Sequence, residues 1–419
     1  MKVLHISSKD IAGGAAIAAY RLHTALNKEG IDSKMLVKNK ITDDPNITVM
    51  RHQRNHIFAK IYRKINHLIV RRMLPKKYNF SDGRLGFNIV NHPWVHDADV
   101  LHLHYINVNA IKLKSLKHLS KLNKPIIWTM HDMWSFTGGC HYAGNCQKYK
   151  QTCEKCPVLA SHKNRDLSHK IFSEKDYTYK QISFHSVACS QWLGQCAKDS
   201  HLLKHQQVSV IQNTLNTNLF KPVNTENSRE RLNISEDKFT IMFGAMKATS
   251  DPRKGYKYLM EALTLFLNHK AVDPAKIQVI IVGASAESNN QEPRHSITTD
   301  IQYLGTFTDE LSMALSYDAA DLFVAPSLED NLPNMVLESL SCGTPVVAFN
   351  IGGMPDLIKH THHGFIADEI TSKALAEGML YYYQDQARLK QHSVHAREHV
   401  LKHNHESIIA KQYIAVYNE

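Results

Sequence analysis

Short apolar runs separated by segments of helical periodicity follow one another along the whole chain. The runs end at glycines or polar turns, and apolar positions three and four apart follow them. Such runs are typical of strands that are buried on both faces of a parallel sheet. The predicted strands are 3–7, 35–37, 99–104, 125–130, 184–189, 208–211, 239–243, 279–282, 301–304, 322–325 and 346–349.

This alternation of strand, loop and helix runs through both halves of the chain. The polar stretch 224–231 separates the halves and is predicted to be an interdomain linker. A length of 419 residues fits two domains of roughly 200 residues each. The sequence therefore predicts an α/β protein made of two doubly wound, Rossmann-like domains, with a ligand crevice between them.

Composition places the chain among globular proteins. Hydrophobic residues make up 43% and charged residues 21%, and the longest apolar runs are too short to span a membrane. The first strand begins at once and leaves no room for a signal peptide, so we expect a cytoplasmic protein. The net charge of +11 indicates an anionic partner, which is a phosphate group, a lipid surface or a nucleic acid.

The stretch 327–349 joins two predicted strands through a loop and a helix. Pro333 suits the first turn of that helix, and Gly343 follows its end. A helix that begins at the end of a parallel strand offers free N–H groups to a phosphate. Asp330 and Glu338 flank the helix start, and their carboxylates suit hydroxyl groups. A ligand with both kinds of group is a nucleotide sugar.

At these residues the chain resembles family 4 of the retaining glycosyltransferases, which have the GT-B fold. That family has two acids separated by seven residues, then a small-residue helix and a G-T-P-V-V strand, as here around Asp330 and Glu338. The resemblance implies that the first acid meets sugar hydroxyls and that Glu338 holds the ribose. The family usually has Glu at the first place, so the adjacent Glu329 is an alternative partner. Gly352 and Gly353 also match family glycines.

The same resemblance implies further site residues. Lys254, in a K-G pair, would neutralise the departing diphosphate, and His131 at a strand end would contact the transferred sugar. Ala245 stands where the family often has a second cation, and Lys247 or Arg253 would replace it. The implied catalytic residues are His131, Lys254 and Asp330. The implied donor-binding residues are Gly13, Gly14, Lys247, Arg253, Lys254, Glu329, Asp330, Asn331, Leu332, Pro333, Asn334 and Glu338.

The resemblance also sets the expected domain bounds. Residues 213–220 are similar to the family's linker motif, which places an acceptor-side domain at 1–220 and a nucleotide-sugar-binding domain at 221–400. Helical periodicity from 372 to 417 ends in a helix, 401–419, that is expected to return to the first domain.

Four cysteines form an insert at 140–156. Cys140, Cys146, Cys153 and Cys156 end in C-x-x-C-P, which is similar to a small zinc knuckle. We predict a structural zinc site there, with His141 as an alternative ligand, whereas disulfides are disfavoured in a reducing cytoplasm. Exopolysaccharide enzymes of family 4, of the colanic-acid type, resemble this insert. Catalysis is expected to require no cofactor.

A basic amphipathic helix is predicted over 51–73. Its apolar positions recur at three and four, and the basic side chains among them are those of Arg54, Lys60, Arg63, Lys64, Arg71 and Arg72. Such a helix can lie on an anionic bilayer or dock on its own domain with a solvated basic face. Both interpretations stand at this point.

The combined pattern predicts a retaining glycosyltransferase that moves a sugar from a nucleotide-sugar donor to a glycan or lipid-linked acceptor in bacterial surface polysaccharide synthesis. It would act in the cytoplasm, at the inner membrane face, and no nucleic acid is expected as partner. The alternatives are a GT-B phosphorylase or synthase-like enzyme and a non-catalytic protein that binds nucleotide sugars or nucleic acid.

Overall fold

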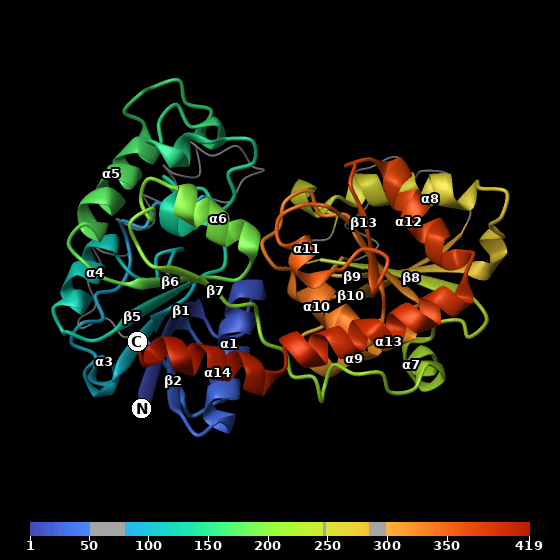
Figure 1. Ribbon diagram of the computed structural model, residues 1–419, viewed down its shortest axis with the longest axis horizontal. Helices are drawn as coiled ribbons and strands as arrows, with labels where there is room; N and C mark the ends of the chain where they lie inside the picture. The colour runs from blue at the N-terminus through green and yellow to red at the C-terminus, as the bar shows by residue number, and fades with distance from the viewer. Residues whose placement is uncertain (51–79, 246–248, 285–298) are drawn as a thin grey trace. The chain divides into compact units, whose positions relative to one another are not determined.

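The computed structural model describes residues 1–50, 80–245, 249–284 and 299–419. The predicted basic helix at 51–73 and Lys247 lie outside the described residues. The chain divides into two compact units, one of Met1–Asn213 with Ile409–Glu419 and one of Thr214–Ile408 (Figure 1). Among the described residues, no helix has both the length and the apolar character needed to cross a membrane.

The first unit is built on a seven-stranded parallel sheet in the order β3-β2-β1-β4-β5-β6-β7. The sheet order brings β1 beside β4, although about ninety residues of the sequence separate them. The strands are β1 (Lys2–Lys9), β2 (Asp32–Asn39), β3 (Ile47–Val49), β4 (Val100–Leu103), β5 (Ile126–Met130), β6 (His185–Ala188) and β7 (Val208–Val210).

Helices cover both faces of this sheet (Figure 1). Val3 of β1 packs on α1 and α14, whereas the next residue, Leu4, packs in the cluster on the other face, as the alternation of a strand requires. The helices of the unit are α1 (Gly14–Lys28), α3 (Pro93–Asp97), α4 (Leu113–Ser120), α5 (Leu167–Tyr179), α6 (Gln191–Asp199) and α14 (Glu406–Tyr417), which belongs to this unit from Ile409 onward.

The second unit has a six-stranded parallel sheet in the order β10-β9-β8-β11-β12-β13. The strands are β8 (Phe239–Gly244), β9 (Ile277–Val282), β10 (Asp300–Gly305), β11 (Leu322–Ala325), β12 (Val346–Phe349) and β13 (Gly364–Ala367). The helices are α7 (Thr225–Leu232), α8 (Tyr256–Leu267), α9 (Glu310–Ala319), α10 (Asn334–Ser341), α11 (Met354–Leu357), α12 (Ser372–Tyr383) and α13 (Gln386–His403).

The expected fold class is confirmed, because both units are doubly wound parallel sheets. The interpretation of 224–231 as a linker is wrong. Those residues lie in the second unit, where they form α7, and the Asn224 side chain caps this helix by accepting from the Asn227 N–H at 2.9 Å. Buried Arg229 anchors the helix to the sheet through Asp321, with Nη2 and Oδ2 2.8 Å apart.

Candidate functional site

Lys254 and Asp330 meet at the carboxyl end of the second sheet. Lys254 ends the short helix Pro252–Lys254, which comes after β8, and Asp330 lies in the loop after β11, the neighbour of β8. The Lys254 Nζ is 2.5 Å from Asp330 Oδ2, and the two side chains are 19% and 11% exposed. An ammonium group and a carboxylate are therefore held together at the edge where parallel sheets bind ligands.

Two glycines let the loops of this edge approach so closely. Gly255 has a φ of +71°, and a Cβ there would lie 1.8 Å from the Pro326 carbonyl oxygen. Gly352 has a φ of +51°, and a Cβ there would lie 1.8 Å from the carbonyl oxygen of Asp330. Since backbone atoms cannot move aside cheaply, any larger residue at either position would displace the loop that carries Asp330.

Arg253, next to Lys254 in the sequence, holds the loop of Asp330 by hydrogen bonds. Its guanidinium donates to the Asp251 carboxylate at 2.8 Å and to the Glu329 carbonyl oxygen at 3.0 Å. Its own carbonyl accepts from the Leu328 N–H at 2.7 Å. Arg253 thus ties the 251–255 turn to the 328–330 loop, and its charge lies near Asp330.

The pKa of the Asp330 carboxyl reflects this cationic surrounding. Burial acts to raise the pKa, but Lys254, Arg253 and the Asn331 N–H together outweigh it and hold the pKa below its usual value. The Asn331 N–H donates to Asp330 Oδ1 at 3.1 Å. Asp330 is therefore ionised at neutral pH and presents a carboxylate hydrogen-bond acceptor at the site.

Glu338 lies one turn into α10, which follows the loop at once. Its side chain is buried and one carboxylate oxygen accepts from the Tyr317 hydroxyl of α9 at 2.9 Å. Pro333 is the cap of α10 rather than its first helical residue. Asn331 and Leu332 are buried, whereas Glu329, Pro333 and Asn334 are half-buried. Through this hydrogen bond Tyr317 joins the candidate site. It was not predicted from the sequence, because no spacing links a residue of α9 to Glu338.

The remaining site candidates belong to the first unit. Gly13, with a φ of +100°, caps α1, and Gly14 begins that helix. His131 follows β5 directly, and its Nε2 is 3.2 Å from His104 Nδ1. Burial lowers the pKa of His131 to about 4, so this imidazole is neutral at physiological pH.

The four cysteines of the insert are all free. Cys153 and Cys156 are buried, and burial together with neighbouring thiols raises the pKa of Cys140 and Cys153. No three of the four sulfur atoms lie within 4.8 Å of one another in the described structure, so zinc would require them to draw closer. The His141 ring is 2.7 Å from Asp132 and 2.9 Å from Ser81. The zinc site therefore stays a prediction from the sequence.

Replacement of the two half-buried thiols tests that site. We expect C140S/C146S to carry about one zinc equivalent per chain less than the wild type, because tetrahedral structural sites need four ligands. Chelation should loosen 140–156 before the units unfold. Metal analysis and thiol titration measure this, and equal zinc in both proteins, with all four insert thiols of the wild type titratable, would exclude the site.

The chain is similar to a known protein family, to curated relatives and to solved structures. Residues 238–385 match the family described as glycosyl transferases group 1. The putative colanic acid biosynthesis glycosyl transferase WcaC of Escherichia coli is 21% identical over 384 residues, which cover 88% of each chain.

The N,N'-diacetylbacillosaminyl-diphospho-undecaprenol alpha-1,3-N-acetylgalactosaminyltransferase of Campylobacter jejuni is 25% identical over 52% of this chain and 55% of its own length. The chain thus spans about half the length of several curated relatives that it matches.

The solved structure of Anabaena HepE in complex with UDP has a TM-score of 0.66 and 16% identity, and the match covers both chains fully. This likeness establishes the fold. The matched residues 238–385 include Lys254, Asp330 and Glu338. The second unit therefore contains a region that is similar to the group 1 glycosyl transferases, and the chain has the GT-B fold that the sequence predicted.

Proposed function

We propose that the protein is a retaining glycosyltransferase that moves a sugar from a nucleotide-sugar donor to a glycan or lipid-linked acceptor. The observation that carries the proposal is the Lys254–Asp330 pair beside the start of α10, with Glu338 one turn further on. Positive charge, a helix N-terminus and two buried carboxylates match the diphosphate, the sugar and the ribose of such a donor.

In this proposal Lys254 is the group that stabilises the leaving diphosphate. Its ammonium would move from Asp330 to the phosphate oxygens, where negative charge grows as the sugar bond breaks. Asp330 would then accept hydrogen bonds from sugar hydroxyls, and the N–H groups at the start of α10 would bind the same phosphates. The leaving phosphate would help to take the acceptor's proton on one face of the sugar, which retains the anomeric configuration.

The relatives support the choice of substrates. HepE was solved with UDP, the Campylobacter enzyme's name gives a diphospho-undecaprenol acceptor, and WcaC is named for colanic acid biosynthesis. We propose that this chain likewise takes a nucleoside diphosphate sugar and extends a lipid-linked glycan of a surface polysaccharide. UDP-sugars and undecaprenyl diphosphate glycans are the first compounds to test.

A thermal shift panel of nucleotide sugars tests donor binding directly. At a donor concentration 100 times Kd, binding adds about 2.7 kcal/mol to the free energy of unfolding, which raises Tm by several degrees. NMR of the product then reports the anomeric configuration. A product of inverted configuration would contradict retention, and a donor that binds but is never cleaved would favour a non-catalytic binding protein.

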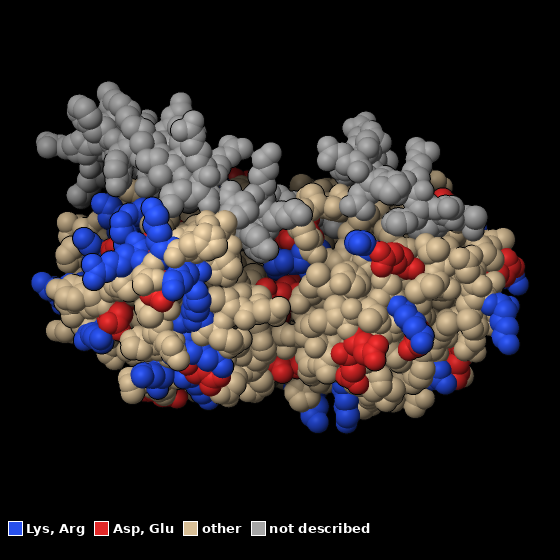
Figure 2. Space-filling view, turned by 90° about the horizontal axis from the view of Figure 1, so that it is seen from above, with Lys and Arg blue, Asp and Glu red and all other residues tan. Residues whose placement is uncertain are grey.

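Contact with anionic membrane follows from the predicted basic helix at 51–73. On the face shown in Figure 2, Lys and Arg side chains gather over the described part of the first unit. Changing Arg63, Lys64, Arg71 and Arg72 to Glu should release the protein from anionic vesicles, since each cation near such a surface adds about 1 kcal/mol. Donor binding should be unchanged, because the donor site is expected to be built mainly by Lys254 and the loop of Asp330 and includes none of these four residues.

Co-sedimentation with vesicles across salt concentrations measures this release. Glu substitutions at Lys180, Lys257 and Lys373, which are 68%, 73% and 82% exposed, are the charge control. A wild-type protein that stays in the supernatant even at low salt would rule out the membrane contact.

A further inference from the structure

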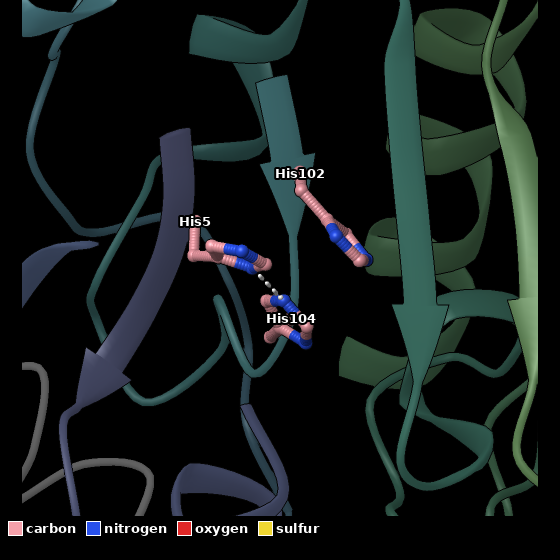
Figure 3. Close-up of side chains that lie close together, drawn as sticks. All are labelled: His5, His102 and His104. Atoms are coloured by element: carbon pink, nitrogen blue, oxygen red, sulfur yellow. Dashed lines mark hydrogen bonds between the residues drawn. The ribbon is translucent and has the colours of Figure 1, made fainter. Parts of the chain in front are cut away.

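Three buried histidines meet on one face of the first sheet. His5 of β1 and His102 of β4 are register partners in adjacent strands, and His104 follows two residues later on the same face. Figure 3 shows the His5 and His104 rings joined by a hydrogen bond, with the His102 ring beside them. The exposed fractions are 0% for His5 and His102 and 3% for His104, so α1 and α14 seal the group from solvent.

We propose that His5, His102 and His104 form a binding site for a divalent transition-metal ion of the zinc class. One nitrogen from each ring lies within 4.8 Å of the others, and this is the one such group of three or more potential ligands in the described parts of the chain. Three imidazoles with an open fourth position are an established zinc ligand set, and neutral imidazole also suits copper and nickel.

The three rings would need only a small rearrangement to bind an ion. A zinc–nitrogen bond of about 2.0–2.1 Å in tetrahedral geometry places ligand nitrogens about 3.4 Å apart. His5 Nδ1 and His104 Nε2 are 2.8 Å apart and share a hydrogen bond, so this pair would separate by about 0.6 Å. No strand has to move, because rotation of the rings supplies changes of this size.

The protonation states also favour an ion. Burial lowers the pKa of all three imidazoles well below 6.5, with further lowering of the His5 and His104 pKa by neighbouring histidines and of the His102 pKa by His131. The rings are therefore neutral at physiological pH, and a metal ion would displace no proton from the imidazolium form.

The hydrogen bonds around the group leave it incomplete without a further partner. Among the described residues, buried His5 Nε2 has no hydrogen-bond partner. An ion bound through Nε2, in place of Nδ1, would supply that partner.

His102 and His104 also have outer partners. His102 is 2.7 Å from the Tyr417 hydroxyl and 2.7 Å from Thr129 Oγ1, and His104 Nδ1 is 3.2 Å from His131 Nε2. Imidazole ligands in metal sites keep such a partner on their second nitrogen, which fixes the ring. The group thus has the outer partners of a metal site, and an ion would replace one of the two hydrogen bonds of His102.

Zinc content of single variants tests the proposal. Wild type, His5→Gln and His104→Gln are freed of metal with a chelator, loaded with ZnCl₂ and passed through a desalting column. We expect each variant to retain about one zinc equivalent per chain less than the wild type. This difference is independent of any zinc at the cysteine insert, which all three proteins share, and of the proposed transferase activity.

His23→Gln is the matched control. His23 is a fully buried histidine of α1 whose ring centroid is 6.0 Å from that of His5, but it is not one of the converging ligands. The His23→Gln protein should retain the wild-type amount of zinc. Equal zinc in all four proteins would overturn the site and leave a hydrogen-bonded histidine core.

If the variants do not fold, amide hydrogen exchange of the wild-type protein tests the proposal instead. Zinc loading of the metal-free protein should slow amide hydrogen exchange in β1 and β4 at least tenfold, because those two strands carry the ligands. Exchange in β11 and β12 of the second unit should not change. Unchanged exchange in β1 and β4 on zinc loading would overturn the proposal.

Discussion

Lys254→Met should lower kcat/KM for sugar transfer by about 100- to 1,000-fold. Loss of a single group that stabilises developing negative charge has this effect in enzymes generally. Lys254 is placed for that role because its ammonium group lies at the sheet edge with Asp330 and next to the start of α10. The methionine side chain keeps most of the volume, so the turn at Gly255 should persist.

A matched lysine three residues away separates charge at the site from charge in general. Lys257 is 73% exposed and forms a surface pair with Glu261, so Lys257→Met should keep wild-type kinetics. The melting temperatures of both variants check the fold, because Lys254→Met leaves the buried Asp330 without its main cation. Wild-type turnover in Lys254→Met would show that another group stabilises the leaving diphosphate.

Glu338→Gln should raise KM for the donor by about 10- to 100-fold. A carboxylate hydrogen bond to a ligand hydroxyl is worth about 1.5–3 kcal/mol, and 1.4 kcal/mol corresponds to a factor of ten. Glutamine keeps the shape and can still accept from the Tyr317 hydroxyl, so the packing of α10 on α9 should be preserved.

Two further variants test the role of Glu338 more finely. Tyr317→Phe removes the hydroxyl that orients the carboxylate and should raise the donor KM by a smaller factor, with kcat less affected. Glu377→Gln changes a Glu of α12 that is 57% exposed and should leave kinetics unchanged. An unchanged donor KM with normal turnover in Glu338→Gln would rule out the assignment to ribose.

Most strands could be predicted from the sequence, because a buried parallel strand is a compact apolar run. The strands β3 and β13 were not predicted. The predictions at 322–325 and 346–349 match β11 and β12 to the residue. The helix α7 was missed because its surface is polar and one buried arginine, Arg229, holds it in place. A single long-range ion pair of this kind leaves no periodic signal.

The candidate site residues were predicted one by one, but their contacts with one another were not. A motif resemblance marks Lys254, Asp330 and Glu338, yet the pairing of Lys254 with Asp330 depends on β8 and β11 being neighbours in the sheet. The histidine group shows the same limit. Alternation predicts that His102 and His104 share a face, but only the strand order brings His5 to them.

The most direct measurement of the central claim is acceptor-dependent release of nucleoside diphosphate from a nucleotide sugar. Wild type and Lys254→Met are compared on a donor that the thermal shift panel identifies, with and without a lipid-linked glycan acceptor. We expect the wild type to release nucleoside diphosphate at a rate that rises with the acceptor. In Lys254→Met this rate should be at least 100-fold lower. Release that is absent from the wild type with every donor that binds, or that is equal in the two proteins, would contradict the central claim.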